Sequence, residues 1–392
     1  MGKNDYERSK TQKRKGLLCV VFARASMQTS MTIYSNMIQA QGYCNWAIIF
    51  YDGLKSYEDE ICRKVKNDPK NKIATCKRSA YALTTSGTIH DNVGNEDSHT
   101  TSNHFDIDHP PLNETELQQL LVEETSKEIF VEDVDDEKNT LYIDDDDNKV
   151  KDLVLNRGRK AIPKSVLYSD LLPYLYEYKR IFLMDEDISL VGFDAEKTMN
   201  TWSCSFYPLP PPLVVQPLIA ESKQFFNFVG SKAWAGKGVS ASATGLVEQQ
   251  VPMFDAVFFE WFVRRCLSMT KQDAINAGVD WGGDRTWCNA AKMYAREVLN
   301  LPSKYVYCAL LVGGTPVHHL NTKAIATKRT NRKEFLKKGF QMVDIYVKLF
   351  PTWTILDITR SVNPLDRFHG RKFPKMKGIN STCVAQRNFE YQ

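Results

Sequence analysis

The feature that most constrains this chain is a short apolar run that ends abruptly on two acidic residues. Residues 181–184 have the length and composition of a buried strand, and Asp185 and Asp187 follow with Glu186 between them. A buried strand that ends in charge brings that charge to the rim of a sheet, where α/β folds bind ligands. Two carboxylates there repel each other unless a cation lies between them, and hard oxygen ligands suit Mg²⁺ or Mn²⁺. The pattern therefore predicts a metal–phosphate site, and the simpler alternative is a strand followed by a solvated acidic turn.

The N-terminal part predicts a strand–helix–strand unit with a right-handed connection. Residues 17–23 form a continuous apolar run, typical of a buried parallel strand, and Arg24 follows it. A helix is expected over residues 26–39, where four apolar residues lie near helical spacing: Met27, Met31, Tyr34 and Ile38. A second strand over 46–51 ends on Asp52. A carboxylate in that position often holds a ribose hydroxyl, and a turn-forming residue before Gly53 is the alternative.

Charge is distributed unevenly along the chain. The net charge is +4, but residues 91–150 contain 19 Asp and Glu against 3 Lys and Arg, a net of −16, so the remainder carries +20. Such a basic body suits an anionic ligand such as a nucleotide diphosphate, although nucleic acid or an anionic membrane would also fit. Residues 84–150 predict an acidic, disordered, non-catalytic insertion, and residues 1–15 a basic disordered lead-in.

The second half of the chain predicts an alternation of helices and strands. Helical spacing of leucines at 167–175 precedes the acidic strand, and a helix near 193–202, a strand at 213–215 and a helix at 255–267 follow it. Residues 222–242 mix glycines with Lys232 and Lys237, which favours either a lid over a phosphate or a surface loop. A helix over 284–299 would have Asp284 at its N-cap. A strand at 305–311 is followed by the histidine pair and then by a basic helix at 332–349.

The cysteines and the apolar stretches suggest a compartment. The nine cysteines are odd in number and scattered, which argues against a disulfide framework or a zinc cluster and fits a reducing compartment. No signal peptide is visible, and the uncharged stretch at 198–220 contains too many prolines for a membrane helix. We therefore expect a cytoplasmic protein without a transmembrane anchor.

Four motifs, taken in order and spacing, resemble the domain-of-unknown-function 707 family of GT-A-like glycosyltransferases. They are Phe50-Tyr51-Asp52-Gly53, Phe182-Leu183-Met184-Asp185-Glu186-Asp187, Trp281-Gly282-Gly283-Asp284 with Cys288, and Val317-His318-His319. The resemblance covers roughly residues 17–80 and 160–325, and the chain departs from it in the long insertion and at Asn321-Thr322-Lys323. It implies a GT-A-like (Rossmann-like), mixed and mostly parallel sheet flanked by helices. The catalytic domain would span 16–325, interrupted by the insertion, with a basic helical extension at 326–392.

The resemblance also implies roles for the acidic motif and its surroundings. In GT-A-like enzymes such a motif holds a divalent ion on the diphosphate of a sugar nucleotide. This assigns Asp185 and Asp187 to the metal or the ribose, with Glu186 in support, and suggests His318 or His319 as a further ligand. A surface histidine pair is the alternative. Arg24, Lys232, Lys237 and Arg285 are candidate phosphate contacts, with solvated surface as their alternative.

The tryptophan motif resembles the acceptor site of some inverting galactosyltransferases. By that resemblance Asp284 would take the proton of the acceptor hydroxyl and Trp281 would stack on a sugar ring, with Gly282, Gly283 and Arg285 beside them. A helix N-cap with a buried Trp is the alternative.

We therefore expect a metal-dependent, inverting glycosyltransferase that uses Mn²⁺ or Mg²⁺ and a UDP- or GDP-sugar. Its acceptor would be a glycan or glycoprotein, and no nucleic-acid partner is expected. The alternatives are a phosphohydrolase of the haloacid dehalogenase type, which would normally have its acidic pair on an early strand, and an inactive GT-A-like module that binds sugar or nucleotide.

Overall fold

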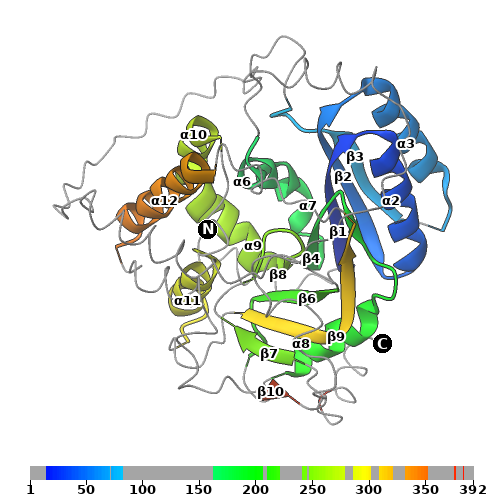
Figure 1. Cartoon of the computed structure of the whole chain (residues 1–392). Helices are drawn as coiled ribbons and strands as arrows, with labels where there is room; N and C mark the ends of the chain where they lie inside the picture. Colours follow the sequence, from blue (N-terminus) through cyan, green and yellow to red (C-terminus); the bar gives the residue numbers. More distant parts are fainter. Residues whose placement is uncertain are drawn as a thin grey trace, which may run out of the picture. The chain divides into compact units, whose positions relative to one another are not determined.

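The computed structural model describes residues 15–70, 72–82, 162–205, 210–220, 241–244, 247–278, 286–301, 309–320, 332–351, 375–376 and 383 (Figure 1). All of these belong to one compact unit of the chain. The predicted lead-in and acidic insertion thus fall almost entirely outside the described residues, and the predicted domain boundaries remain predictions.

Ten strands of the described residues form one sheet, in the order β10-β7-β9-β6-β8-β4-β1-β2-β3 with β5 paired to β9. Their bounds are β1 (Lys15–Ala25), β2 (Cys44–Gly53), β3 (Lys72–Arg78), β4 (Tyr178–Asp185), β5 (Ile188–Ser189), β6 (Val214–Ala220), β7 (Ala241–Thr244), β8 (Met253–Asp255), β9 (Ala309–His319) and β10 (Lys375–Met376). The six longest strands run in one direction, β5, β7 and β8 pair antiparallel to them, and β10 pairs antiparallel to β7. The predicted α/β class with a mixed, mostly parallel sheet is confirmed.

The chain order of the strands reverses between β1 and β4. From β1 the sheet grows outward through β2 to β3, and β4 then pairs with the other side of β1. Such a topological switch point opens a crevice at the carboxyl ends of the two central strands, and open α/β sheets bind ligands there. Phe22 of β1 lies opposite Asp185, so the acidic motif lies at this point.

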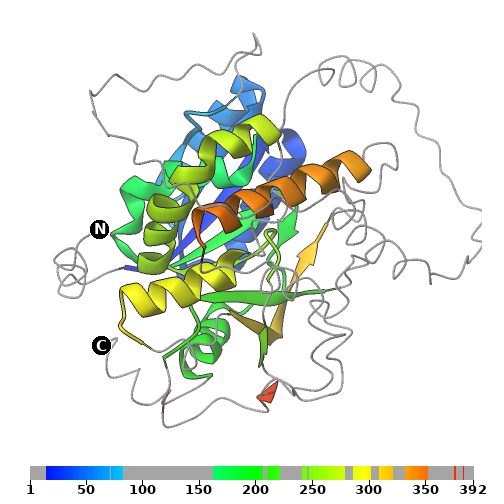
Figure 2. The ribbon, with the colours of Figure 1, turned by 90° about the vertical axis from the view of Figure 1, so that its left-hand side faces the viewer.

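Helices cover both faces of the sheet (Figure 1). One face packs against α2 (Met27–Gln39), α3 (Lys55–Asn67) and α8 (Ala195–Cys204). The other packs against α6 (Lys164–Leu167), the 3₁₀ helix η1 (Tyr168–Leu171), α7 (Leu172–Leu175), α9 (Ala256–Phe262), the π-helix η3 (Val263–Leu267), α10 (Ser268–Ala277), α11 (Trp287–Glu297) and α12 (Arg332–Leu349). Seen from this second side, α12 (orange) and α11 (yellow) lie in front of the strands (Figure 2). None of the helices in the described ranges has both the length and the apolar character that crossing a bilayer requires.

Aromatic packing fixes α9 and α11 on the sheet. Phe258 of α9 is fully buried and its ring lies 5.5 Å from that of Tyr294 in α11. Trp287, the first residue of α11, meets Phe254 of β8 edge-on at 4.9 Å. Burying an aromatic side chain of this size contributes about 2 kcal/mol to stability, so these contacts hold the start of α11 against the centre of the sheet.

The predicted helix after β1 forms, but it packs through a different face. Ser26 caps α2 by accepting a hydrogen bond from the Thr29 backbone N–H, and Ile33 and Met37 are buried. Three residues of the predicted apolar face are instead exposed, Met27 at 66%, Met31 at 65% and Ile38 at 67%. Apolar residues occur on both sides of this helix, so their spacing alone does not determine which side meets the sheet.

Two boundaries near the predicted site differ from the sequence prediction. The helix expected over residues 284–299 is α11, which begins at Trp287 with Thr286 at its N-cap, and Asp284 lies outside the described residues. The strand expected to end at residue 311 continues through Val317 and His319, so the histidine pair is part of β9 and does not follow it. The strand continues because its last two residues pair with β5.

The cysteines are mostly paired, which overturns the prediction of a chain without disulfides. Cys19–Cys44 joins β1 to β2, Cys62–Cys76 joins α3 to β3, and Cys204–Cys383 ties the C-terminal segment to α8 across 179 residues of sequence. Cys288 is also disulfide-bonded, and Cys266 is free and buried. The spacing along the chain gave no sign of these pairs because each bond joins elements that meet only in the fold.

These disulfides predict a specific peptide map. Alkylation of the denatured, unreduced protein followed by mass spectrometry should label Cys266 and should recover the three linked peptide pairs. Replacing Cys204 and Cys383 together by Ser should lower the free energy of unfolding by about 2 to 4 kcal/mol, because the cross-link no longer restricts the unfolded chain. Complete alkylation of all of these cysteines without reduction would contradict the pairing.

Candidate functional site

The acidic motif lies at the carboxyl edge of the sheet, where three parallel strands end together. Asp185 is the last residue of β4, Arg24 lies near the end of β1, and Asp52 near the end of β2. Glu186 and Asp187 form the turn that leads into β5. The edge therefore collects charged groups from three separate strands at the topological switch point.

A short antiparallel pairing brings the distant histidine to this edge. Ile188 of β5 lies opposite His319 of β9, and the Leu320 N–H donates to the carbonyl of Asp187 at 2.8 Å. His319 Nε2 then lies 3.3 Å from Asp187 Oδ2. Neighbouring residues of a strand point to opposite faces, so His318 faces away from Asp187. Of the two predicted histidines, the structure brings His319 to the acidic motif.

Asn36 fixes the strand that follows the acidic turn. Its Nδ2 donates to the carbonyl of Ile188 at 2.7 Å, and its Oδ1 accepts from the Leu190 N–H at 2.8 Å. Asn36 lies on α2 and is 1% exposed, so both hydrogen bonds are shielded from water. Asn36 was not predicted as a site residue, because an Asn within a helical pattern gives no sign of what it meets.

Lys164, the first residue of α6, forms an ion pair with Asp185 Oδ1. Both side chains are largely covered, at 28% and 21% exposure, so the pair is less screened than a surface salt bridge. Lys164 was not predicted as a site residue, because a single Lys at the start of a helix is ordinarily solvated surface. The ammonium of Lys164 therefore offsets part of the negative charge of the acidic motif.

Glu186 turns inward between β1 and β2. Its carboxylate accepts hydrogen bonds from the Arg24 backbone N–H and from the Tyr51 hydroxyl, the latter at 3.2 Å. Burial is the largest influence and raises the pKa of Glu186 to about 7 in spite of both hydrogen bonds, with a smaller contribution from Asp187 and Asp185. Burial, together with Glu186, also raises the pKa of the Tyr51 hydroxyl, so Tyr51 remains a donor.

The ends of β1 and β2 approach each other closely beside this carboxylate. Arg24 Nε lies 3.5 Å from Asp52 Oδ2, and the two residues are partners in the strand register. Gly53 follows with a φ of +97°, and a Cβ there would meet the carbonyl oxygen of Ala25 at 2.3 Å. Gly53 is therefore required by this close approach, and Asp52 combines a turn position with an ion pair to the candidate phosphate contact.

The charge of the acidic motif is incompletely neutralised. Burial raises the pKa of Asp187, His319 acts in the opposite direction, and the charge of Asp185 adds to the rise. Within the described residues, no three His, Cys, Asp or Glu side chains converge tightly enough to hold a metal ion. The two carboxylates nevertheless suit Mn²⁺ or Mg²⁺, and the imidazole favours Mn²⁺ because Mg²⁺ prefers oxygen ligands. Lys164 occupies one of the carboxylates.

Several predicted site residues lie outside the described residues. They are the two lysines of the predicted lid, Lys232 and Lys237, and the tryptophan motif with its neighbour, Trp281, Gly282, Gly283, Asp284 and Arg285. The helix α11 begins two residues after Arg285, and its first residue packs on β8.

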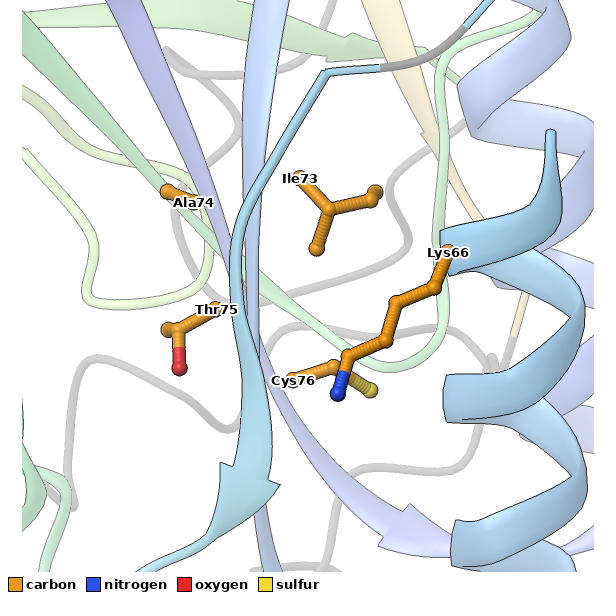
Figure 3. A pocket seen from close by; sticks show the side chains of 5 residues that line it. All are labelled: Lys66, Ile73, Ala74, Thr75 and Cys76. Carbon is orange, nitrogen blue, oxygen red and sulfur yellow. The ribbon is translucent and has the colours of Figure 1, made fainter. Parts of the chain in front are cut away.

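A pocket of about 460 Å³ lies elsewhere, on the edge strand β3 and on α3 (Figure 3). Ile73, Ala74, Thr75 and Cys76 line it from β3, and Lys66 extends over it from the helix. It holds neither a carboxylate nor a histidine, and its strand residues lie before the carboxyl end of β3. We therefore place the candidate site at the acidic edge and not in this pocket.

The comparisons with known proteins give distant likenesses. No family model and no curated protein matches the chain, so the family resemblance remains a prediction. A mannosyltransferase from Pyrobaculum calidifontis, solved with GDP-Man and Mn²⁺, is 10% identical with a TM-score of 0.37, covering 99% of this chain and 86% of that one. The apo bifunctional glycosyltransferase WbbM is 9% identical with a TM-score of 0.28, covering 85% and 52%. Likenesses this weak carry no argument, and the function rests on the chain's own residues.

Glu186 predicts a pH-dependent stability. With a folded pKa of about 7 against an ordinary value of 4.5, the unfolded chain releases the proton first, so stability falls as pH rises between these values. The shift corresponds to about 3 kcal/mol. Denaturant unfolding of metal-free protein should therefore show Glu186→Gln becoming more stable relative to the wild type as pH rises from 5 to 8. An unchanged difference across that range would contradict the burial of an ionised Glu186.

Proposed function

We propose that the chain is a metal-dependent glycosyltransferase that moves a sugar from a nucleotide-sugar donor to an acceptor hydroxyl. The observation that carries this proposal is the 3.3 Å contact between Asp187 and His319 at the edge that also holds Asp185. Two carboxylates and an imidazole form a donor set for a divalent cation. Their position at a topological switch point is where α/β folds bind phosphate-bearing ligands.

Mn²⁺ or Mg²⁺ would be held by Asp187 and His319, with Asp185 as a third ligand after its release from Lys164. When bound, the cation neutralises charge on the leaving diphosphate. The carboxylate of Glu186 would hold the turn at residues 186–187 in place by accepting hydrogen bonds from the Arg24 backbone and from Tyr51. The residues present therefore fit a divalent ion in charge and in ligand type.

The nucleotide diphosphate would lie along the ends of β1 and β2. Asp52 is our candidate for the ribose hydroxyls, and Arg24, which lies 3.5 Å from it, for a phosphate. Lys232 and Lys237 are proposed as further phosphate contacts. Either UDP or GDP would suit these groups, because both present a ribose and a diphosphate.

The acceptor would approach from the segment before α11. Asp284 is the proposed base that removes the proton of the acceptor hydroxyl, which would give inversion. Trp281, Gly282, Gly283 and Arg285 are proposed to contact a glycan or glycoprotein acceptor. Support comes from the packing of Trp287 on Phe254, which anchors the helix that follows this motif to the sheet.

No observation on the described residues favours the two alternatives. A phosphohydrolase of the haloacid dehalogenase type would normally have its acidic pair on an early strand, whereas the pair here ends β4, after three strands of the same sheet. A catalytically inactive module would bind the same nucleotide without transferring a sugar, and a transfer assay separates it from the enzyme.

We also propose that the protein folds in an oxidising compartment, in place of the cytoplasm predicted from its cysteines. The support is the pairing of seven of the eight described cysteines. Disulfides of this kind form and persist in secretory and extracellular environments and are rare where thiols are kept reduced.

A thermal-shift panel tests the metal–nucleotide site. UDP or GDP should raise the melting temperature in the presence of Mn²⁺ and much less without it, with about 2.7 kcal/mol of stabilisation at a ligand concentration of 100 Kd. Asp187→Ala should lose this metal-dependent shift, because the cation loses a ligand. The matched control is Asp59→Ala on α3, where the side chain is 65% exposed and pairs with Lys55 and not with the acidic motif. An Asp187→Ala protein that retained the full shift would refute the site.

Lys164 gives a second prediction. In the metal-free protein its ammonium holds Asp185, so an arriving cation must displace it. Lys164→Met should therefore bind Mn²⁺ several-fold more tightly in the absence of nucleotide, measured by isothermal titration. Lys55→Met, which changes a 66% exposed lysine on α3, is the control. Weaker Mn²⁺ binding by Lys164→Met alone would show that the Lys does not compete with the metal.

A further inference from the structure

The central strand β6 carries one buried amide in an otherwise apolar sequence. Gln216 is 0% exposed, and its Oε1 accepts a hydrogen bond from the Glu248 backbone N–H at 2.6 Å. Because the oxygen is used in this way, the orientation of the amide is fixed and Nε2 is left as its donor atom. Nε2 has no hydrogen-bond partner among the described residues. Buried polar groups are almost always paired, so this donor calls for an explanation.

A second glutamine, whose unpaired atom is an acceptor and not a donor, lies on the segment beside the acidic strand. The backbone carbonyl of Gln250 accepts a hydrogen bond from the Asp185 N–H at 3.0 Å, which ties this residue directly to the acidic motif. Its side-chain Oε1 is buried and likewise has no partner in the described part of the chain. Glu248, two residues earlier, is 7% exposed. Residues 248–250 thus provide an amide acceptor and a buried carboxylate, and Gln216 provides a donor.

The strand register places Gln216 near the acidic motif. Phe254 of β8 pairs with Ile181 of β4 on one side and with Val214 of β6 on the other. Ile181 and Val214 therefore lie at the same height along the strands. Counted from this height, Gln216 is two residues along β6 and Asp185 is four residues along β4. The two strands are separated by β8, as Figure 1 shows. Strand spacing and rise put the two Cα atoms about 12 Å apart.

Both side chains also belong to the same face of the sheet. Gln216 alternates in phase with Val214 and Leu218, and Asp185 with Ile181 and Leu183. All four of these apolar residues lie in one core cluster, the one covered by α6, α9 and α11. Lys164 of α6 reaches Asp185 from this same side. A group extending from a diphosphate at Asp185 toward β6 would therefore meet the amide of Gln216.

We propose that Gln216, Gln250 and Glu248 form the subsite that binds the hydroxyls of the donor sugar. This inference rests on the proposed glycosyltransferase function and names the residues that determine which sugar is accepted. A hydroxyl both accepts and donates hydrogen bonds, so it can accept from Gln216 Nε2 and donate to Gln250 Oε1 or to the Glu248 carboxylate. A subsite that hydrogen-bonds hydroxyls rejects analogues that lack them, because its own polar groups then remain unpaired.

Isothermal titration in the presence of Mn²⁺ tests the subsite. The probes are UDP or GDP, whichever stabilises the protein, and its hexose ester. Gln216→Met keeps the length of the side chain and removes the Nε2 donor together with the oxygen that accepts the Glu248 N–H. It should bind the sugar ester about tenfold more weakly and the diphosphate as well as the wild type does. Gln272→Met, the same change at an exposed position of α10, should alter neither.

A series of monodeoxy donor sugars sharpens the comparison. Wild type should lose about tenfold in affinity for the analogue that lacks the bound hydroxyl, and Gln216→Met should not distinguish that analogue from the parent sugar. Should Gln216→Met fail to fold, Gln250→Met offers the same test at a half-buried position. Circular dichroism and the melting temperature show whether each variant is folded.

The outcomes separate the two proposals. Equal weakening of diphosphate and sugar ester, or no effect on either, would mean that the amides are structural or satisfied by buried water, and would overturn the subsite alone. Absence of metal-dependent binding of any nucleotide diphosphate to the wild type would overturn the proposed function and the subsite with it. Selective loss of the sugar ester, with the diphosphate unaffected, would support both.

Discussion

Repulsion between the two carboxylates at the end of β4 is the constraint around which this edge of the molecule is arranged. Both are shielded from water, which makes their charge costly, and burial raises the pKa of Asp187. The fold offsets the repulsion with Lys164 on Asp185 and with His319 on Asp187. These partners come from α6 and β9, which are far from β4 in sequence, so the charge arrangement exists only in the folded chain. A divalent cation would act at the same place with a higher charge.

The surrounding architecture makes this arrangement rigid. Asn36 holds the strand after the acidic turn with two buried hydrogen bonds, and β5 in turn holds the end of β9. On the other side Glu186 is fastened to the backbone of Arg24 and to Tyr51. Each residue of the acidic motif thus has its own support from a different element. Preorganisation of this kind suits a site that binds a charged ligand, because the backbone of the turn is already held in place and the Lys164 side chain is the group that must move.

The predictions made from the sequence succeeded where a local pattern has one physical meaning. Apolar runs predicted the strands β1, β2 and β4, because a run of that length can lie only in a core. They failed where two arrangements satisfy the same pattern. The spacing of Met27, Met31 and Ile38 suggested the inner face of α2, yet Ile33 and Met37 are the residues that are buried. The cysteines failed for a related reason, since Cys19 and Cys44 become neighbours only when β1 pairs with β2.

The sequence by itself determined that a buried strand ends in paired carboxylates, that the fold is α/β, and that charge gathers where strands stop. It determined these because hydrophobic period and strand length are properties of a contiguous segment. Only the tertiary structure decided which histidine meets Asp187, that Lys164 neutralises Asp185, and that Gln216 and Gln250 bury polar atoms without a partner in the described part of the chain. These are contacts between residues separated by up to 132 positions in the chain, from Asp187 to His319. Strand register and helix packing determine them, and neither is a property of one segment.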